Sequence, residues 1–325
     1  MNVESRAQGA FLGLAVGDAL GFPVEGLSRK RARRRYSGID RYRFLGRTGF
    51  VSDDTEQAII IAEAILESDG APGQAARIFG KKLKGWFWTI PPGVGMSTIK
   101  ACLRLTVGAK SGVLSAGNGA AMRVAPVGIF SENPTALSVA LARVTHTDPR
   151  GVEGAVAVAV AVSRIVRGLP CELSDLPEFE SELAEPMARA YELARSGVKF
   201  DDIADEIGVT GYVLHTVPLA FAAYWSEPAS FLEGLRTVIL QGGDADSNGA
   251  VAGALLGAHF GVEGIPEELV SGLEPTHGRA RIGALANALL AGGGEVKRPG
   301  FLALRWRELV VKFGVGLHVL GRLVP

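Results

Sequence analysis

The sequence predicts an all-α protein, a compact single-domain bundle of many helices around one core. Apolar residues recur at helical spacing far more often than they alternate, and 47% of the 325 residues are hydrophobic. Glycines recur every four residues in two segments, which lets helices approach closely along a row of small residues. Two acidic clusters are each followed by an apolar run, as expected at helix N-termini. Length alone allows one or two domains.

The two glycine rows mark the first and one of the last predicted helices. The rows are Gly9, Gly13, Gly17 and Gly21, and then Gly249, Gly253 and Gly257. Between them, helical spacing is clearest in Ala58 to Leu66, Ala136 to Val144 and Ala155 to Val162. The last run alternates Val and Ala, which a strand also shows, but its surrounding length favours a buried helix. Cys171 to Glu185 is polar and acidic, and we expect it to be a peripheral connection.

The end of the chain has a different character. Three consecutive glycines separate residues 1–292, the predicted helical domain, from residues 293–325, a basic amphipathic extension. A helix of this kind can lie on a membrane or pack on a partner. Packing on its own domain or on a dimer mate is the commoner arrangement, and the pattern alone does not decide.

Composition excludes several classes of protein. Lys+Arg and Asp+Glu both number 34, so a strongly basic nucleic-acid binder is not indicated. The basic stretch Arg29 to Arg35 is a solvated face or an anion patch. Two cysteines and an N-terminus without a signal-peptide pattern favour a reducing, cytoplasmic location. The longest apolar stretch is too short for stable membrane insertion, and the sequence leaves the oligomeric state open.

The acidic clusters are Ser52-Asp53-Asp54-Thr55 and Gly242-Gly243-Asp244-Ala245-Asp246-Ser247. Helix capping explains one carboxylate in each, for example Asp53 with Glu56 in a capping box. It does not explain a second carboxylate beside the first, twice. If the two helix ends meet, four carboxylates repel one another unless cations lie between them. The clusters therefore indicate a site for hard metal ions with oxygen ligands.

Four other polar segments are candidates for function, each with an ordinary structural alternative. Glu25 lies in a Pro-Gly turn, suited to proton transfer or simply exposed. The loop Ser115 to Met122 can bind an anion such as a diphosphate through backbone amides, although such loops are common. Pro91 to Thr98 follows aromatic residues 86–88, which form a stacking wall or plain core. His146 lies beside Thr and Asp and is structural or binds substrate.

In order along the chain, these segments resemble the ADP-ribosylglycohydrolase family. The matching stretches are GLAVGDALGFPVEG (13–26), SDDTEQA (52–58), PPGVGMST (91–98), GNGAAMRVAPVG (117–128), THTDP (145–149), GYVLHTVPLAF (211–221) and QGGDADSNGAVAGALLG (241–257). The resemblance implies an all-α fold with a two-magnesium, sometimes manganese, centre in a cleft. It implies the metal ligands Ser52, Asp53, Asp54, Asp244, Asp246 and Ser247. It places the diphosphate and ribose at Ser115, Gly117, Asn118, Gly119 and His146, and a mobile glutamate at Glu25.

The implied activity is hydrolysis of the glycosidic bond between ADP-ribose and an acceptor, which is a protein side chain, a nucleic-acid end or a small molecule. The expected catalytic residues are Glu25, Asp54, Asp244 and Asp246, with the general base undecided among Glu25, Asp244 and Asp246. Two alternatives remain: a non-catalytic ADP-ribose-binding member, or a two-metal phosphohydrolase. Serine replaces the family's usual threonine in both clusters, and His215 stands where an acidic residue is common. We expect these changes to weaken metal retention without removing the site.

Overall fold

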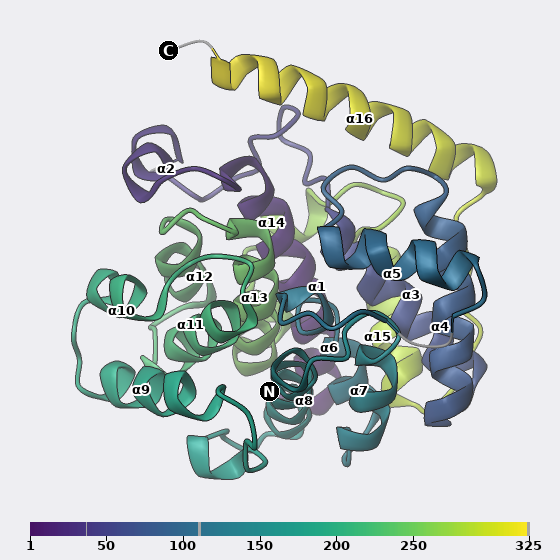
Figure 1. Cartoon of the computed structure of the whole chain (residues 1–325). Coiled ribbons are helices and arrows are strands. Elements are labelled where there is room, and N and C mark those ends of the chain that lie inside the picture. The colour runs from purple at the N-terminus through teal and green to yellow at the C-terminus, as the bar shows by residue number, and fades with distance from the viewer. Residues whose placement is uncertain (37, 110–111, 324–325) are drawn as a thin grey trace.

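A computed structural model describes residues 1–36, 38–109 and 112–323 of the chain, so the last two residues of the predicted extension lie outside the description. The described residues form sixteen α-helices and four short 3-10 helices, with no β-strand, in one compact body (Figure 1). The all-α prediction is confirmed.

The helices of the first half are α1 (Val3–Gly21), α2 (Arg29–Tyr36), α3 (Asp53–Glu67), α4 (Pro72–Phe87), α5 (Met96–Thr106), α6 (Ala125–Phe130), α7 (Thr135–Ala142) and α8 (Pro149–Val166). Those of the second half are α9 (Ala184–Arg195), α10 (Phe200–Ile207), α11 (Val213–Trp225), α12 (Phe231–Ile239), α13 (Ala245–Phe260), α14 (Glu267–Ser271), α15 (Arg279–Leu290) and α16 (Phe301–Leu323). The 3-10 helices are Phe22–Val24, Asn118–Ala120, Leu173–Asp175 and Val262–Gly264.

Helices α1 and α13 lie at the centre and touch backbone to backbone along the two glycine rows. A Cβ atom added to Gly13 would lie 2.2 Å from the carbonyl oxygen of Gly253, and one added to Gly17 would lie 2.0 Å from that of Gly249. Because residue numbers rise along α1 as they fall along α13, the helices are antiparallel. The C-terminal end of α1 therefore meets the N-terminal end of α13.

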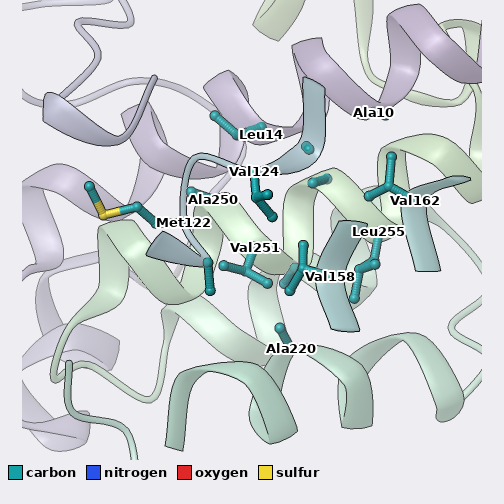
Figure 2. Packing of buried hydrophobic residues seen from close by; sticks show 14 of the residues in the cluster. Ala10, Leu14, Met122, Val124, Val158, Val162, Ala220, Ala250, Val251 and Leu255 are labelled. Carbon is teal, nitrogen blue, oxygen red and sulfur yellow. The ribbon is translucent and has the colours of Figure 1, made fainter. Parts of the chain in front are cut away.

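The core surrounds this pair. Figure 2 shows Leu14 of α1, Val251 of α13 and Val158 of α8 in one buried cluster, with Ala220 of α11 below them. The Val–Ala run is thus part of the buried helix α8, as predicted. Among the described residues, one segment, Val3–Val24, has the length and hydropathy of a membrane span, but 94% of its apolar window is buried inside the protein.

The periphery agrees with the remaining sequence expectations. The basic stretch forms α2, a largely exposed helix whose Arg29 and Arg33 pair with Asp205 and Asp201 of α10. Residues 171–183 connect α8 to α9 as short turns and one 3-10 helix. Both cysteines are buried and free. Helix α16 crosses one end of the molecule, at the top of Figure 1.

Candidate metal centre

The N-terminus of α3 presents the first acidic cluster to the protein interior. Ser52 is the N-cap, and its side chain accepts a hydrogen bond from the amide of Asp54. Buried Asp18, near the end of α1, accepts from the amides of Ser52 at 3.0 Å and Thr55 at 3.2 Å, and from the Thr55 hydroxyl. Ser52 and Asp18 thus satisfy the amides that begin the helix. The carboxylates of Asp53 and Asp54 are not used as caps and line a cavity.

The second acidic cluster begins α13 in a similar way. The amide of Asp244 donates to the carbonyl of Val209 at 2.9 Å, and its side chain makes no capping bond. That carboxylate instead accepts from Nδ2 of Asn118 at 2.6 Å. Asp246 and Ser247 lie in the first turn, where the Ser247 amide donates to Oδ1 of Asp246 at 3.0 Å. Both carboxylates of this cluster also line the cavity.

Glu25 reaches the same place because its loop is fastened to the turn before Asp244. The Gly26 amide donates to the carbonyl of Gly243 at 2.7 Å, and the Gly243 amide donates to that of Leu27 at 2.9 Å. Gly26 and Gly243 have φ angles of +74° and +67°, where glycine is favoured. Two glycine turns therefore hold the loop of Glu25 against the start of α13.

The two acidic clusters meet, as the sequence led us to expect. Asp54 and Ser247 are 193 residues apart in the chain, yet their Oδ1 and Oγ atoms are 3.4 Å apart. Glu25, Asp244 and Asp246 each offer a carboxylate oxygen, and these oxygens lie within 4.8 Å of one another. All five residues line a cavity of about 440 Å³.

The electrostatics of this cavity suit bound cations. Burial raises the pKa of Asp53, Asp54 and Asp246 well above the usual value of an aspartate, and the neighbouring carboxylates raise each pKa further. Oδ2 of Asp54 is buried and has no hydrogen-bond partner among the described residues. A set of carboxylate and hydroxyl oxygens is what hard divalent ions prefer. The residues present therefore fit a metal centre.

A buried chain of hydrogen bonds links this centre to His146. Nε2 of Gln57 donates to Oδ2 of Asp53 at 2.7 Å. The Arg123 guanidinium donates both to the side-chain oxygen of Gln57 and to the hydroxyl of Thr145. The Thr145 hydroxyl is 2.8 Å from Nδ1 of His146. One fully buried arginine thus connects the α3 carboxylates to the histidine.

This chain also determines the protonation of His146. Burial, together with the nearby charge of Arg123, lowers the pKa of His146 to about 3, so the ring is neutral. The Thr145 oxygen accepts from Arg123, and when its hydroxyl proton is donated to Nδ1 the ring proton resides on Nε2. Nε2 lies beside Gly117 and Gly119 in the cavity wall. In this tautomer the N–H of His146 faces the cavity.

The glycine-rich loop forms part of the wall, but not all its amides face the cavity. The Gly117 amide donates to Oγ of Ser115 at 3.2 Å, and the Asn118 amide donates to the carbonyl of Gly211 at 3.0 Å. These two amides are already engaged within the protein. The segment 93–98 passes nearby, since a Cβ added to Gly93 would lie 3.7 Å from Oδ1 of Asp53.

Comparison with known proteins identifies the family. The sequence profile described as ADP-ribosylglycohydrolase matches residues 1–299. The chain belongs to the ADP-ribosylglycohydrolase family. It is 30% identical over 286 residues to the ADP-ribosyl-[dinitrogen reductase] glycohydrolase of Rhodospirillum rubrum, covering 84% of this chain and 92% of that protein. It is 37% identical over 291 residues to an uncharacterized protein of Archaeoglobus fulgidus, covering 84% and 92%.

Solved structures agree. A chain of an ADP-ribosylglycohydrolase-related protein complex superposes with a TM-score of 0.67 at 29% identity, covering 90% of this chain and 99% of that one. The family resemblance and the fold inferred from the sequence are both confirmed.

Most of the residues expected to form an ADP-ribosylglycohydrolase site lie around the cavity. Lining residues include Glu25, Asp53, Asp54, Gly117, Asn118, Gly119, His146, Asp244, Asp246 and Ser247. Ser52 and Ser115 are not among the lining residues. Ser52 caps α3, and Ser115 bonds to Gly117 and, at 2.7 Å, to Ser97. A ligand role for Ser52 and a substrate role for Ser115 stay predictions.

Three features noted in the sequence have no direct part in the cavity. The N-cap of α3 is Ser52, so Asp53 and Glu56 do not form a capping box; Glu56 accepts instead from Trp86 and Arg307. The aromatic residues before Pro91 do not line the cavity. His215 also lies outside the lining residues and bonds through Nδ1 to Thr210 at 2.8 Å.

Sequence reasoning missed the buried residues that hold the site together. Gln57 follows Asp53 by four residues, which places both on one face of α3, and this spacing is a usable signal. Arg123 stands alone in an apolar segment, which indicates a paired buried charge. The role of Thr145 had no signal of its own.

Proposed function

We propose that this protein hydrolyses the glycosidic bond between ADP-ribose and an acceptor, releasing ADP-ribose, with two divalent cations. The observation that carries the proposal is the meeting of two aspartate-rich helix N-termini in one cavity, with Glu25 beside them. Family membership supports the reaction class. The name of the Rhodospirillum rubrum relative describes removal of ADP-ribose from a protein, which supports an ADP-ribosylated protein as substrate.

The cations, Mg²⁺ or Mn²⁺, would be held by the carboxylates of α3 and α13 and by Ser247, with Ser52 as a further ligand. When bound, they supply positive charge that orients ribose hydroxyls and lowers the pKa of a water. Asn118 keeps the Asp244 carboxylate in position through its 2.6 Å hydrogen bond. Gln57 does the same for Asp53.

The other cavity residues have separate tasks. Cleavage at the anomeric carbon builds oxocarbenium character in the sugar, and a carboxylate is needed to take a proton from the attacking water. Glu25, Asp244 and Asp246 are the candidates, and Glu25 alone belongs to neither ligand cluster. His146 donates through Nε2 to a ribose or diphosphate oxygen. Gly119 and the 93–98 segment leave room for the ligand.

We further propose that residues 1–292 form the catalytic domain, that residues 293–325 are an added extension, and that the protein works in the cytoplasm. The buried free cysteines support a reducing compartment. The end of α15 at Leu290 supports the boundary.

The test is an assay of ADP-ribosylated arginine, serine, nucleic-acid ends and small molecules, with Mg²⁺ or Mn²⁺ and with chelator. Products are separated by chromatography and identified by mass. We expect free ADP-ribose, lost in chelator and in Asp54→Ala and Asp246→Ala. Asp202→Ala is the matched control, since Asp202 also lies in the first turn of a helix but is exposed.

Each other outcome has a meaning. Turnover in chelator contradicts the metal dependence. AMP and ribose phosphate as products would identify a phosphohydrolase. Tight binding of ADP-ribose with no product on any substrate would identify a binding protein.

A further inference from the structure

Helix α16 attaches to the molecule through hydrogen bonds and ion pairs as well as through the buried Val311. It lies beyond the 1–299 segment that matches the family profile and crosses the top of the molecule in Figure 1. Arg307 is only 6% exposed, although it is a charged residue of an outlying helix. Its Nε donates to Oε1 of Glu274 at 2.7 Å, Nη1 donates to Glu56, and Nη2 donates to the carbonyl of Val51 at 2.7 Å.

The partners of Arg307 bracket the first metal-ligand cluster. Val51 immediately precedes Ser52, and Glu56 lies two residues after Asp54 on the first turns of α3. A single guanidinium is thus bonded to the chain on both sides of these ligands. Its third partner, Glu274, is fixed by His277 at 2.8 Å.

Two further bonds join α16 to other segments that lead into the cavity. Nζ of Lys312 donates to the carbonyl of Thr89 at 2.7 Å, four residues before Gly93 of the cavity wall. Nε2 of His318 is 3.2 Å from the carbonyl of Pro23, two residues before Glu25. The three carbonyls that α16 contacts, those of Pro23, Val51 and Thr89, each lie a few residues before residues that line the cavity.

We propose that α16 is a strap that positions these cavity segments, and that Arg307 is the positioning residue for the α3 ligands. This inference rests on the proposed metal centre. Removing the guanidinium leaves Glu56 and Glu274 buried without their cation, beside a site that is already acidic. Residues that support metal ligands from behind typically change metal affinity about 10- to 100-fold when replaced.

The experiment measures Mn²⁺ binding to the full chain by electron paramagnetic resonance, without substrate, together with thermal melting. We expect Arg307→Met to weaken Mn²⁺ binding at least about tenfold. Arg307→Lys keeps the charge but cannot reach all three partners, so we expect an intermediate loss. Val311→Ala is the packing control, because Val311 is buried on the same helix at 2% exposure. Arg305→Met removes an exposed arginine of the same helix.

Unchanged Mn²⁺ affinity in folded Arg307→Met, or equal loss in Val311→Ala, overturns the strap. If Arg307→Met does not fold, Arg307→Lys decides by the same criterion. Failure of the parent protein to bind Mn²⁺ would instead refute the metal centre itself, so the two failures are distinguishable.

The outer face of α16 carries an independent observation: it exposes large apolar side chains. Leu302 is 81% exposed, Trp306 69%, Leu309 62% and Phe313 68%. Spacings of four, three and four residues place these side chains on one face. A contiguous apolar surface of this kind usually marks an interaction site.

The loop of residues 41–48 brings arginines close to this apolar face. Its Leu45 and Thr48 line a groove together with Trp306, Leu309 and Phe313. Leu45 also lines a second cavity, with Arg41, Arg43 and Arg47 of the same loop. Arg41 and Arg47 are exposed. Since the whole chain has a formal net charge of zero, this basic concentration is local. Exposed Trp, Phe and Leu beside Arg match the interface of a bilayer with anionic lipids.

We infer that the outer face of α16 docks peripherally on an anionic lipid surface. Helix α16 would lie parallel to the lipid surface, because Arg307 and Lys312 bond it to the protein. A second copy of the chain fits less well, since twofold pairing along α16 would bring two arginine-rich borders together.

The test is flotation of the full chain with vesicles of phosphatidylcholine alone or with a quarter of phosphatidylglycerol. We expect binding to the anionic vesicles only, weakened by 0.5 M salt and lost in Trp306→Ser/Phe313→Ser. Arg41→Glu/Arg47→Glu should weaken binding more than about tenfold, at roughly fivefold for each charge removed. Val107→Ser/Leu169→Ser, at residues 84% and 51% exposed elsewhere, should bind normally.

Light scattering without lipid tests the alternative that this face binds a second copy of the chain. A dimer that Trp306→Ser/Phe313→Ser converts to a monomer would assign the face to a second copy and overturn lipid docking. Equal binding to neutral vesicles, or no binding to either, also overturns it.

Discussion

Asp246→Asn tests the electrostatic cost of placing several carboxylates in the proposed metal centre. Asp246 is buried at the start of α13, and its Oδ1 accepts from the Ser247 amide. Asparagine keeps that acceptor and nearly the same volume while removing one negative charge. The substitution therefore changes the charge of the cavity with little change in packing.

The size of the effect follows from the carboxylate spacing. Oxygens of Glu25, Asp244 and Asp246 lie within 4.8 Å of one another. Two unit charges at that separation repel by about 3.5 kcal/mol at an effective dielectric constant of about 20. Proton uptake relieves part of this repulsion. We expect chelated Asp246→Asn to be more stable than the parent by about 1–3 kcal/mol at pH 8, raising Tm by roughly 1–4 °C.

The pH dependence has a definite sign. The pKa of Asp246 is raised in the folded protein, so the folded chain holds a proton that the unfolded chain releases above about pH 4. The stabilising effect of this raised pKa is fully present below about pH 4 and is lost as the pH rises toward the folded-state pKa. The difference in stability between Asp246→Asn and the parent should therefore grow with pH. Added Mn²⁺ should stabilise the parent most at high pH, where its ligands are deprotonated.

Scanning calorimetry with chelator and with Mn²⁺, from pH 5 to pH 8, checks this prediction. Asp202→Asn at the exposed start of α10 is the control. If Asp246→Asn and the parent have the same Tm in chelator at every pH, the carboxylates of the cavity do not repel one another strongly. If Mn²⁺ raises the Tm of both proteins equally, Asp246 does not help to bind the metal.

Three further predictions follow from the same cavity. His146 should remain neutral with its proton on Nε2 from pH 5 to pH 8, because its pKa is lowered to about 3; ¹⁵N NMR of the ring checks this, and a titration near pH 6.5 would contradict it. Glu25→Gln should lower kcat at least about 100-fold if Glu25 is the general base, with Mn²⁺ affinity falling much less. Gly21→Ala and Gly9→Ala should both lower Tm, because each added Cβ would lie 2.2 Å from a backbone oxygen of α13. Only Gly21→Ala should also weaken Mn²⁺ binding, since its Cβ would lie 2.6 Å from the Cα of Asp246.

The sequence predicted the helices well because helices depend on local patterns, and it located the two acidic clusters that meet in the cavity. Helical periodicity placed α3, α8 and α13, and paired aspartates at helix starts indicated the proposed metal site. The contacts behind the ligands were not predictable in the same way. Nothing near Asp53 in the sequence indicates that Gln57 reaches Arg123, which lies 66 residues further along. Such partners are selected by packing in three dimensions.

Helix α16 shows what an amphipathic pattern leaves open. The pattern allowed packing on its own domain, on a partner or on a membrane, and in the structure Trp306 and Phe313 are exposed while Arg307 is buried. The reason is that buried Glu56 and Glu274 require a cation, and α16 supplies it. Two buried glutamates outside α16 thus favour the orientation in which Arg307 faces the protein. A hydrophobicity pattern within the helix does not reveal such partners.

The backbone contact between α1 and α13 explains how one cavity can hold so much negative charge. At its end α1 contributes Asp18, which braces the start of α3, and Gly21, which touches α13 at Ala245 and Asp246. The ligand-bearing helix ends are therefore spaced by close-packed main chain, which yields little to side-chain repulsion. Carboxylates placed on rigid helix ends keep their positions for a cation, whereas on free loops they would separate. The glycine rows thus fix the position of the carboxylates as well as the packing of the core.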